Sequence, residues 1–498
     1  MDLLSDIEYL VPRWKHQAEG EERAFQAYLK QKDFGYGFFF EPGTGKSLTT
    51  INVLRRMMMH EQRFLRTMIF APPVVLKNWK EEFKKFSKVE PRKIHVLQDA
   101  GKKRLKIFNE QAFDHTGRQM PGIFITNYEG LLMDDLFNAM LKWQPEVIVF
   151  DESHRLKNPS AKRTKRADIL ANPGDPKLLR KVTRPSVFIL SGSPILNSPM
   201  DIFAQFLALD GGATFGENFF AFRARYFRDA NAGMPSQRHF PNWQPLPRAL
   251  DEIQKLIAAK SMRAKKQDCL DLPPLIKQTI LVEMSVEQKR VYEDMKKNLV
   301  AYLDDEACVA QLAITKALRL MQIVSGFVRT EDENDIAFKE NPKADALADL
   351  LEDLAPDHKV IVWCVFKQDY KTVREICSAL KLPMVELHGD VNATKKNENI
   401  EKFEKDPKVR VLIGHPGSAG IGVNLVASSY AIYYSRTFSL EARLQSEARN
   451  YRGGSERHES ITHIDLVMQG TIEELVVRRL AEKEEIGVKL LQELKHKL

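Results

Sequence analysis

Short apolar runs rich in β-branched or aromatic residues alternate with longer amphipathic segments along most of the chain. In the first half, the runs expected to form strands are Tyr36–Phe40, Thr67–Ala71, Ile94–Leu97, Ile123–Thr126, Glu146–Phe150 and Ser186–Leu190. In the second half, they are Lys359–Val365, Met384–Leu387, Val409–Ile413, Ala431–Tyr434 and Ser460–Leu466. Such alternation is typical of parallel sheets covered by helices. The pattern therefore predicts an α/β fold of two lobes, each a mainly parallel sheet flanked by helices.

A proline-rich stretch, Gly211–Pro274, interrupts this alternation. Its prolines include Pro235, Pro241, Pro245, Pro247, Pro273 and Pro274. We expect an irregular chain there and place the lobe boundary near Met262–Pro274. The predicted domains are an N-terminal lobe of residues 1–265 and a C-terminal lobe of residues 266–498.

Two segments of the second lobe predict helical additions. Ser285–Phe327 has the pattern of two helices that precede the second sheet, so residues 285–327 form the expected helical entry. Residues 471–498 are strongly charged and helical in pattern, which predicts a C-terminal helix packed by one face.

The charge of the chain points to a polyanionic partner. Its 498 residues carry a formal net charge of +8. Because a basic surface attracts polyanions, nucleic acid becomes a leading partner, although a basic enzyme with another substrate would have the same charge.

The lack of targeting signals and the spacing of the cysteines narrow the class of protein further. No apolar run approaches the roughly 18 residues of a membrane span, and the start Met1–Asp6 lacks the features of a signal peptide. We expect no membrane partner and a cytoplasmic protein, bacterial or virus-encoded by preference, or a nuclear one if eukaryotic. The four cysteines form no C-x-x-C pair, so neither a disulfide scaffold nor a zinc site is expected.

A glycine turn after the first expected strand has the composition of a phosphate-binding loop. Glycines let backbone N–H groups curl around phosphates, the following lysine can reach the β- and γ-oxygens, and the serine hydroxyl can ligate Mg²⁺. The residues expected to bind ATP here are Gly43, Thr44, Gly45, Lys46 and Ser47. Phe40 stands where the strict loop pattern has its first glycine. A simple tight turn is the alternative.

Two acidic residues follow the apolar strand that ends at Phe150. Asp151 lies at the carboxyl end of this strand, the sheet edge where ligands bind in open α/β folds. We expect Asp151 to act on Mg²⁺ together with Ser47, and Glu152 to orient and polarise the attacking water. The alternative is a pair of acids that cap a helix.

An arginine pair near the end of the chain could supply positive charge to the γ-phosphate. Arg449 and Arg452 share one side of a helix if Leu440–Tyr451 is helical. Across a cleft from Lys46, one or both would stabilise the charge that develops during hydrolysis. Alternatively they pair with nearby glutamates or with solvent.

The order of these motifs resembles a known family. The chain carries P-G-T-G-K-S, then D-E-S-H, then L-S-G-S-P-I-L-N, then Q-S-E-A-R-N-Y-R, at Pro42–Ser47, Asp151–His154, Leu190–Asn197 and Gln445–Arg452. This set resembles the superfamily two helicase-like motors, and within them the Swi/Snf-type DNA translocases. Further similar runs are Ala71–Trp79, Lys157–Asn158, Asp271–Pro274 and Gly417–Leu425. The departures are Ser47, Ser153, Ser191 and Ser193, which keep a hydroxyl or small side chain, and Gly453–Ser455, where a glutamine is usual.

The resemblance implies two RecA-like lobes, with ATP and Mg²⁺ as cofactors. It implies a DNA-stimulated ATPase that moves along double-stranded DNA, 3′ to 5′ on one strand, and remodels protein–DNA complexes or branched DNA. It also makes Gln17 an adenine-recognising residue and places Gly422 in an ATP-binding loop of the second lobe. We expect a monomer with double-stranded DNA as partner; the sequence does not identify protein partners.

Residues at the start of a helix after one expected strand, at the end of another strand and in the glycine-rich loop of the second lobe are candidate nucleic-acid contacts. They are Lys77, Asn78, Trp79, Thr126, Tyr128, Ser418 and Asn424. All would touch phosphate and sugar, so little base specificity is expected. Two basic runs, Lys102–Arg104 and Lys162–Arg166, could extend the track or could be solvated faces.

Two other functions fit the same motifs. One is a strand-separating 3′–5′ helicase on DNA or RNA. The other is an ATP-switched clamp that binds nucleic acid without stepping.

Overall fold

The computed structural model describes residues 9–30, 35–99, 101–174, 184–196, 198–233, 241–269, 271–304, 310–330, 334–417 and 423–492. The chain divides into two compact units. The first consists mainly of Met1–Ala232 and Pro241–Leu270, and the second mainly of Asp271–Glu484.

The first unit contains a parallel sheet with the strand order β3-β4-β2-β5-β6-β1-β9. Its strands are β1 (Gly35–Phe40), β2 (Thr67–Phe70), β3 (Ile94–Leu97), β4 (Ile123–Thr126), β5 (Val147–Asp151), β6 (Ser186–Leu190) and β9 (Ser261–Ala264). Six of them were expected from their apolar runs. Central strands such as β1 and β5 are buried along their whole length, which explains why they are almost continuously apolar.

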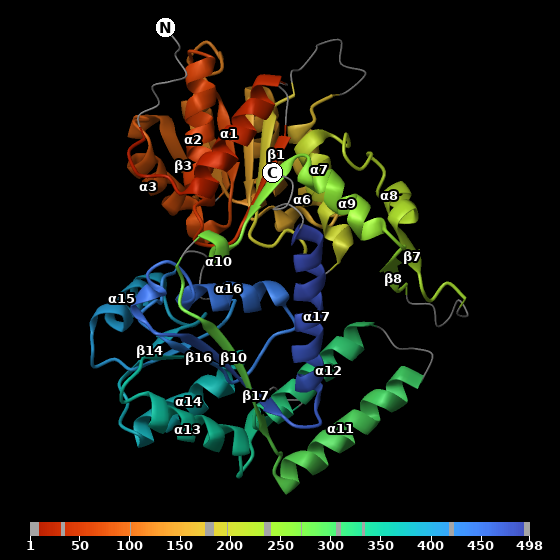
Figure 1. Ribbon diagram of the computed structural model, residues 1–498, viewed down its shortest axis with the longest axis vertical. Helices are drawn as coiled ribbons and strands as arrows, with labels where there is room; N and C mark the ends of the chain where they lie inside the picture. The colour runs from red at the N-terminus through yellow and green to blue at the C-terminus, as the bar shows by residue number, and fades with distance from the viewer. Residues whose placement is uncertain are drawn as a thin grey trace. The chain divides into compact units, whose positions relative to one another are not determined.

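Helices cover both faces of this sheet (Figure 1). They are α1 (Lys15–Lys30), α2 (Lys46–His60), α3 (Leu76–Phe86), α4 (Gly101–Ala112), α5 (Asp134–Trp143), α6 (Lys162–Ala171) and α7 (Ile202–Asp210). Short 3₁₀ turns follow the strand ends at η1 (Pro73–Val75), η3 (Tyr128–Leu132) and η4 (Ser153–Leu156). Phe108, Phe124 and Trp143 form one aromatic part of the core between helices and sheet.

The stretch Gly211–Pro274 is more regular than its prolines suggested. It contains α8 (Phe219–Tyr226), the hairpin β7 (Phe227–Asp229) and β8 (Trp243–Pro245), α9 (Ala249–Ala258), β9 and α10 (Lys266–Cys269). The described prolines Pro241 and Pro247 lie outside these elements, and Pro245 ends β8. The prolines therefore punctuate short elements here, and the expectation of an irregular chain is corrected.

The second unit contains a parallel sheet with the order β10-β17-β16-β13-β15-β14. Its strands are β10 (Leu275–Val282), β13 (Val360–Trp363), β14 (Met384–Leu387), β15 (Val411–Gly414), β16 (Tyr430–Tyr433) and β17 (Ile461–Met468). A small hairpin, β11 (Phe327–Arg329) and β12 (Asp335–Ala337), stands apart from the sheet. β10 was not expected, because this edge strand is mostly exposed and carries polar residues.

The helices of the second unit are α11 (Val286–Asp304), α12 (Ala310–Val324), α13 (Pro342–Leu354), α14 (Lys367–Ala379), α15 (Ala393–Lys405), α16 (Leu440–Asn450) and the part of α17 (Ile472–Gln492) that ends at Glu484. The first two are the helices expected between 285 and 327, and they pack on each other (Figure 1). The predicted fold class, two mainly parallel sheets flanked by helices with short helical insertions, is confirmed. Among the described residues, no helix is both long and apolar enough to cross a membrane.

Candidate functional site

The glycine turn after β1 has the backbone of an anion-binding loop. Gly43 and Gly45 have φ angles of 91° and 89°, a region that glycine adopts without steric cost. α2 begins directly afterwards at Lys46, and no described side chain caps its N-terminus. The amide N–H groups of the first turn are therefore available to an anion such as a phosphate.

Gln17 and His16 pack against this loop from α1. The Gln17 amide donates to the Thr44 carbonyl (3.1 Å) and accepts from the Trp14 N–H (2.9 Å). A ring nitrogen of His16 lies 2.8 Å from the same carbonyl. A Cβ atom on Gly45 would lie 2.3 Å from the Gln17 amide nitrogen, so this contact requires glycine. Gln17 thus supports the loop, while adenine recognition stays a prediction.

The end of β5 brings Asp151 and Glu152 to the carboxyl edge of the sheet. Asp151 is 8% exposed, and its two carboxylate oxygens accept from the indole N–H of Trp79 (2.9 Å) and the backbone N–H of Glu152 (3.0 Å). Glu152 has a φ of 52°, which is uncommon for a residue with a side chain. Its carboxylate lies 3.3 Å from a ring nitrogen of His154.

A third carboxyl group, Glu82 on α3, joins the two acids. The Ser47 hydroxyl is hydrogen-bonded to Glu82, whose pKa is raised by burial. Burial and the neighbouring Glu152 raise the pKa of Asp151 to about 7, although Lys46 acts in the opposite direction. The Lys46 ammonium itself donates to the Phe40 carbonyl (2.9 Å). Negative charge is thus crowded beside the phosphate loop.

The loop after β6 links the acids to the phosphate loop. The Ser191 hydroxyl lies 3.2 Å from a ring nitrogen of His154 and accepts from the Ser193 N–H at 3.1 Å. A Cβ atom on Gly192 would lie 2.7 Å from the Pro42 ring. The sequence identified this run as a motif without a role; the structure shows that it packs on both parts of the site.

These residues fit an ATP molecule with its Mg²⁺ ion. Ser47 and Asp151 offer the oxygen ligands that Mg²⁺ prefers. A divalent cation would favour the charged form of both carboxyl groups, against the burial that raises their pKa values and against the neighbouring Glu152 that raises that of Asp151 further. The uncapped start of α2 suits the phosphates.

The expected nucleic-acid contacts fall into exposed and buried sets. Lys77, Asn78 and Asn424 are exposed. The side chains of Trp79, Thr126 and Tyr128 are at most 1% exposed and make internal hydrogen bonds. This differs from the expectation that these side chains face a polynucleotide: the rings of Trp79 and Tyr128 gain more from burial, and the Thr126 hydroxyl donates to the Leu97 carbonyl. Ser418 and Gly422 lie outside the described residues.

In the second unit, the arginine pair converges on one carbonyl. Arg449, near the end of α16, and Arg452, just after it, each place a guanidinium nitrogen 3.4 Å from the Val423 oxygen. Burial lowers the pKa of Arg452. Glu447, one of the glutamates considered as a partner for the pair, contacts Arg443 (2.6 Å) and Lys277 (3.2 Å).

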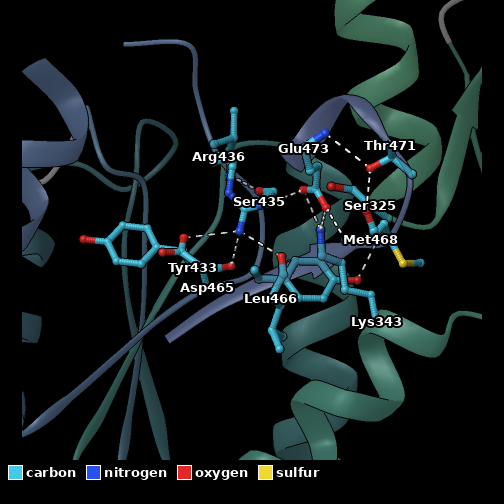
Figure 2. Close-up of polar contacts among 12 residues, drawn as sticks. Ser325, Lys343, Tyr433, Ser435, Arg436, Asp465, Leu466, Met468, Thr471 and Glu473 are labelled. Carbon is cyan, nitrogen blue, oxygen red and sulfur yellow. Dashed lines mark hydrogen bonds and ion pairs between the residues drawn. The ribbon is translucent and has the colours of Figure 1, made fainter. Parts of the chain in front are cut away.

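A buried ionic network in the second unit was not expected from the sequence (Figure 2). Lys343 on α13 contacts both carboxylate oxygens of Glu473 at 2.7 Å, and both side chains are fully buried. Arg436 joins Glu473 (2.8 Å) to Asp465 (3.3 Å). Arg443 on α16 then forms a bidentate pair with Asp465. The one signal in the sequence was an aspartate within the apolar run of β17.

The two parallel-sheet units, the phosphate loop and the acidic strand end define a helicase-like ATPase of superfamily two. A family model described as the SNF2-related domain matches residues 23–329, and one described as the helicase conserved C-terminal domain matches residues 342–454. The chain belongs to the SNF2-related family, which confirms the resemblance and implies the use of ATP.

Relatives come from phages, bacteria and eukaryotes. The chain is 25% identical to "Putative protein p41" of Acyrthosiphon pisum secondary endosymbiont phage 1, over 91% of this chain and 94% of that protein. It is 23% identical to "Uncharacterized ATP-dependent helicase MG018" of Mycoplasma genitalium and 24% to "TATA-binding protein-associated factor mot1" of Aspergillus fumigatus. These matches cover 96% and 87% of this chain but only 42% and 24% of the relatives. The structure "Sulfolobus solfataricus SWI2/SNF2 ATPase core in complex with dsDNA" covers 99% of this chain and 95% of that one, with 22% identity and a TM-score of 0.42.

Proposed function

We propose that the chain is a DNA-stimulated ATPase that moves along double-stranded DNA and thereby remodels protein–DNA complexes or branched DNA. The observation that carries the proposal is the arrangement of Lys46, Ser47, Asp151 and Glu152 around an open helix N-terminus, with Lys77 exposed on the neighbouring helix. Membership of the SNF2-related family and the net charge of +8 support it.

Each residue of the phosphate loop has a role in holding the nucleotide. The N–H groups at the start of α2 would bind phosphate oxygens, and Lys46 would exchange its bond to the Phe40 carbonyl for the β- and γ-phosphates. Ser47 and Asp151 would hold Mg²⁺, Asp151 through the water shell of the ion. The bound ion supplies charge neutralisation to the phosphates.

Glu152 is the proposed base that orients the attacking water. Its left-handed backbone is of the kind found at functional sites, where the surrounding structure maintains the strain. His154 and Ser191 hold its surroundings in place.

Arg449 and Arg452 would stabilise the charge that develops on the γ-phosphate. Their shared acceptor, the Val423 carbonyl, is a weak partner at 3.4 Å, so exchanging it for a phosphate oxygen would lose little. Two guanidinium groups within one turn of chain also suit a phosphate, which accepts several hydrogen bonds at once.

The test is ATP hydrolysis by the purified chain with duplex DNA, single-stranded DNA, forked DNA and RNA. We expect the largest stimulation with duplex DNA. Lys46→Ala should abolish hydrolysis, and Lys106→Ala, at an exposed helical position, should not. Hydrolysis that no polynucleotide stimulates would overturn the proposal.

Two assays on the same preparation separate the related functions. Displacement of a triplex-forming strand driven by ATP shows translocation, and its absence with intact DNA binding would favour an ATP-switched clamp. Strand displacement on a tailed duplex would favour a helicase, the word used in the name of the Mycoplasma relative.

A further inference from the structure

Asp151 is held from two sides by aromatic hydrogen-bond donors. Trp79 donates its indole N–H to a carboxylate oxygen (2.9 Å), and Tyr128 donates its hydroxyl to the backbone carbonyl (2.8 Å). Both rings are 1% exposed. The two donors therefore fix the side chain and the backbone of the same residue.

The first donor comes from a helix with two different sides. Trp79 and Phe83 are the buried aromatic residues of α3, and Glu82 on the same helix is hydrogen-bonded by Ser47. Lys77, Lys84 and Lys85 are exposed on this helix. One rigid element thus joins solvent-facing lysines to both proposed magnesium ligands.

The second donor lies under one of the basic runs. Tyr128 begins η3, directly after β4, and the guanidinium carbon of Arg163 lies 6.0 Å from the centre of its ring. Arg163 also approaches Glu129 (3.4 Å), and Lys162 and Lys165 beside it are exposed. The basic run of α6 is therefore in contact with the segment that holds the Asp151 backbone.

We infer that Trp79 and Tyr128 are positioning residues that transmit nucleic-acid binding at the basic surfaces of α3 and α6 to Asp151, the carboxylate proposed to hold Mg²⁺ through its water shell. The inference rests on the proposed function, because it explains how a polynucleotide accelerates hydrolysis at this site. A phosphate backbone bound by the exposed lysines shifts or stiffens these two elements. The two hydrogen bonds carry that change to the carboxylate.

The physical basis is the short range and the direction of the two bonds. Neither aromatic ring has room to reorient within a packed core, so a displacement of its element changes the donor–acceptor geometry at Asp151 directly. Groups that orient a metal ligand typically change metal affinity by about 10- to 100-fold when they are removed.

Two conservative variants remove the donors and keep the rings. They are Trp79→Phe and Tyr128→Phe. Matched controls are Trp143→Phe, whose indole N–H donates to the Met120 carbonyl (3.0 Å), and Tyr28→Phe, whose hydroxyl donates to Glu61 (2.7 Å). Both control side chains are buried in the first unit and donate to acceptors other than Asp151.

The primary measurement is binding of a fluorescent ATP analogue during a Mg²⁺ titration, with duplex-stimulated hydrolysis and DNA affinity as companions. For Trp79→Phe and Tyr128→Phe we expect about a tenfold higher Mg²⁺ requirement. We also expect a reduced stimulation by duplex DNA with unchanged DNA affinity, and no such changes in the controls. A merely structural role would lower the melting temperature of all four variants alike.

Each outcome bears on one proposal. Test variants that match their controls in Mg²⁺ requirement and in stimulation would overturn the inference, even if the wild type is stimulated by DNA. A wild type that no polynucleotide stimulates would instead overturn the proposed function and the transmission. In that case the Mg²⁺ titration alone still decides whether the two aromatic residues position Asp151.

Discussion

Two sets of buried carboxyl groups, one in each unit, are held in opposite ways. In the first unit, burial raises the pKa values of Asp151 and Glu82, and the neighbouring Glu152 raises that of Asp151 further, although nearby lysines act in the opposite direction. In the second unit, burial alone would raise the pKa of Glu447, but Arg443 and Lys277 outweigh it and lower this pKa to about 2. Excess negative charge in one place and fixed compensation in the other indicate different roles.

Carboxylates paired with fixed cations are typical of a structural scaffold, and carboxyl groups with raised pKa values are typical of a functional site. Each carboxylate of the ionic network in the second unit has a guanidinium or ammonium partner within 3.3 Å. In the first unit, Asp151 accepts hydrogen bonds from neutral donors. Carboxyl groups with perturbed pKa values, such as Asp151, concentrate at functional sites.

The largest expected effect comes from breaking the scaffold. Lys343→Met removes one partner of a fully buried pair and leaves the Glu473 charge without its ammonium. We expect a loss of about 3–5 kcal/mol in the free energy of unfolding of the second unit. Hydrogen exchange read peptide by peptide at increasing urea separates this unit from the first.

The control is Lys395→Met, which breaks an ion pair with Glu398 in which both side chains are 52% exposed. Exposed pairs contribute about 0–1 kcal/mol, so little should change. Equal effects of the two substitutions would show that the buried network is not a scaffold.

The apolar strands and the glycine turn between β1 and α2 could be predicted from the sequence because they are local. The central strands are apolar runs, and consecutive residues encode the turn from β1 to α2. β10 was missed because an exposed edge strand lacks such a run. The pair of Lys343 and Glu473 joins residues 130 positions apart, and no periodicity encodes it.

The second-largest effect is expected from removing the proposed base. Glu152→Gln keeps the shape of the side chain but cannot accept a proton. We expect duplex-stimulated hydrolysis to fall by at least about a hundredfold, with ATP binding retained. Glu110→Gln, on the exposed part of α4, is the control for loss of an acid. Normal turnover in Glu152→Gln would show that Glu152 is not the base.

The arginine pair allows a smaller, graded test. Arg452→Ala should slow hydrolysis by about a hundredfold, less than the roughly thousandfold minimum for a lone arginine finger, because Arg449 remains. ATP affinity should change little. Arg457→Ala is the matched control, since its guanidinium donates to the Val426 carbonyl at 3.0 Å. Weakened ATP binding in Arg452→Ala would point to a role in the ground state instead.

The smallest expected effect concerns stability: removing one buried carboxylate in each unit should change the free energy of unfolding in opposite directions. The pKa of Asp151 is about 7 in the folded chain, above its ordinary value, so its ionisation opposes folding as the pH rises towards 7. Without metal and nucleotide, Asp151→Asn should therefore stabilise the first unit, by about 1–3 kcal/mol at pH 8 and much less at pH 5.

Asp465→Asn should do the opposite. Burial raises the pKa of Asp465 but Arg443 and Arg436 lower it overall, so its carboxylate stabilises the folded state at neutral pH and loses this effect only as the pH falls below about 4. Hydrogen exchange at both pH values measures each unit separately, and the same sign for both substitutions would contradict the division into site and scaffold.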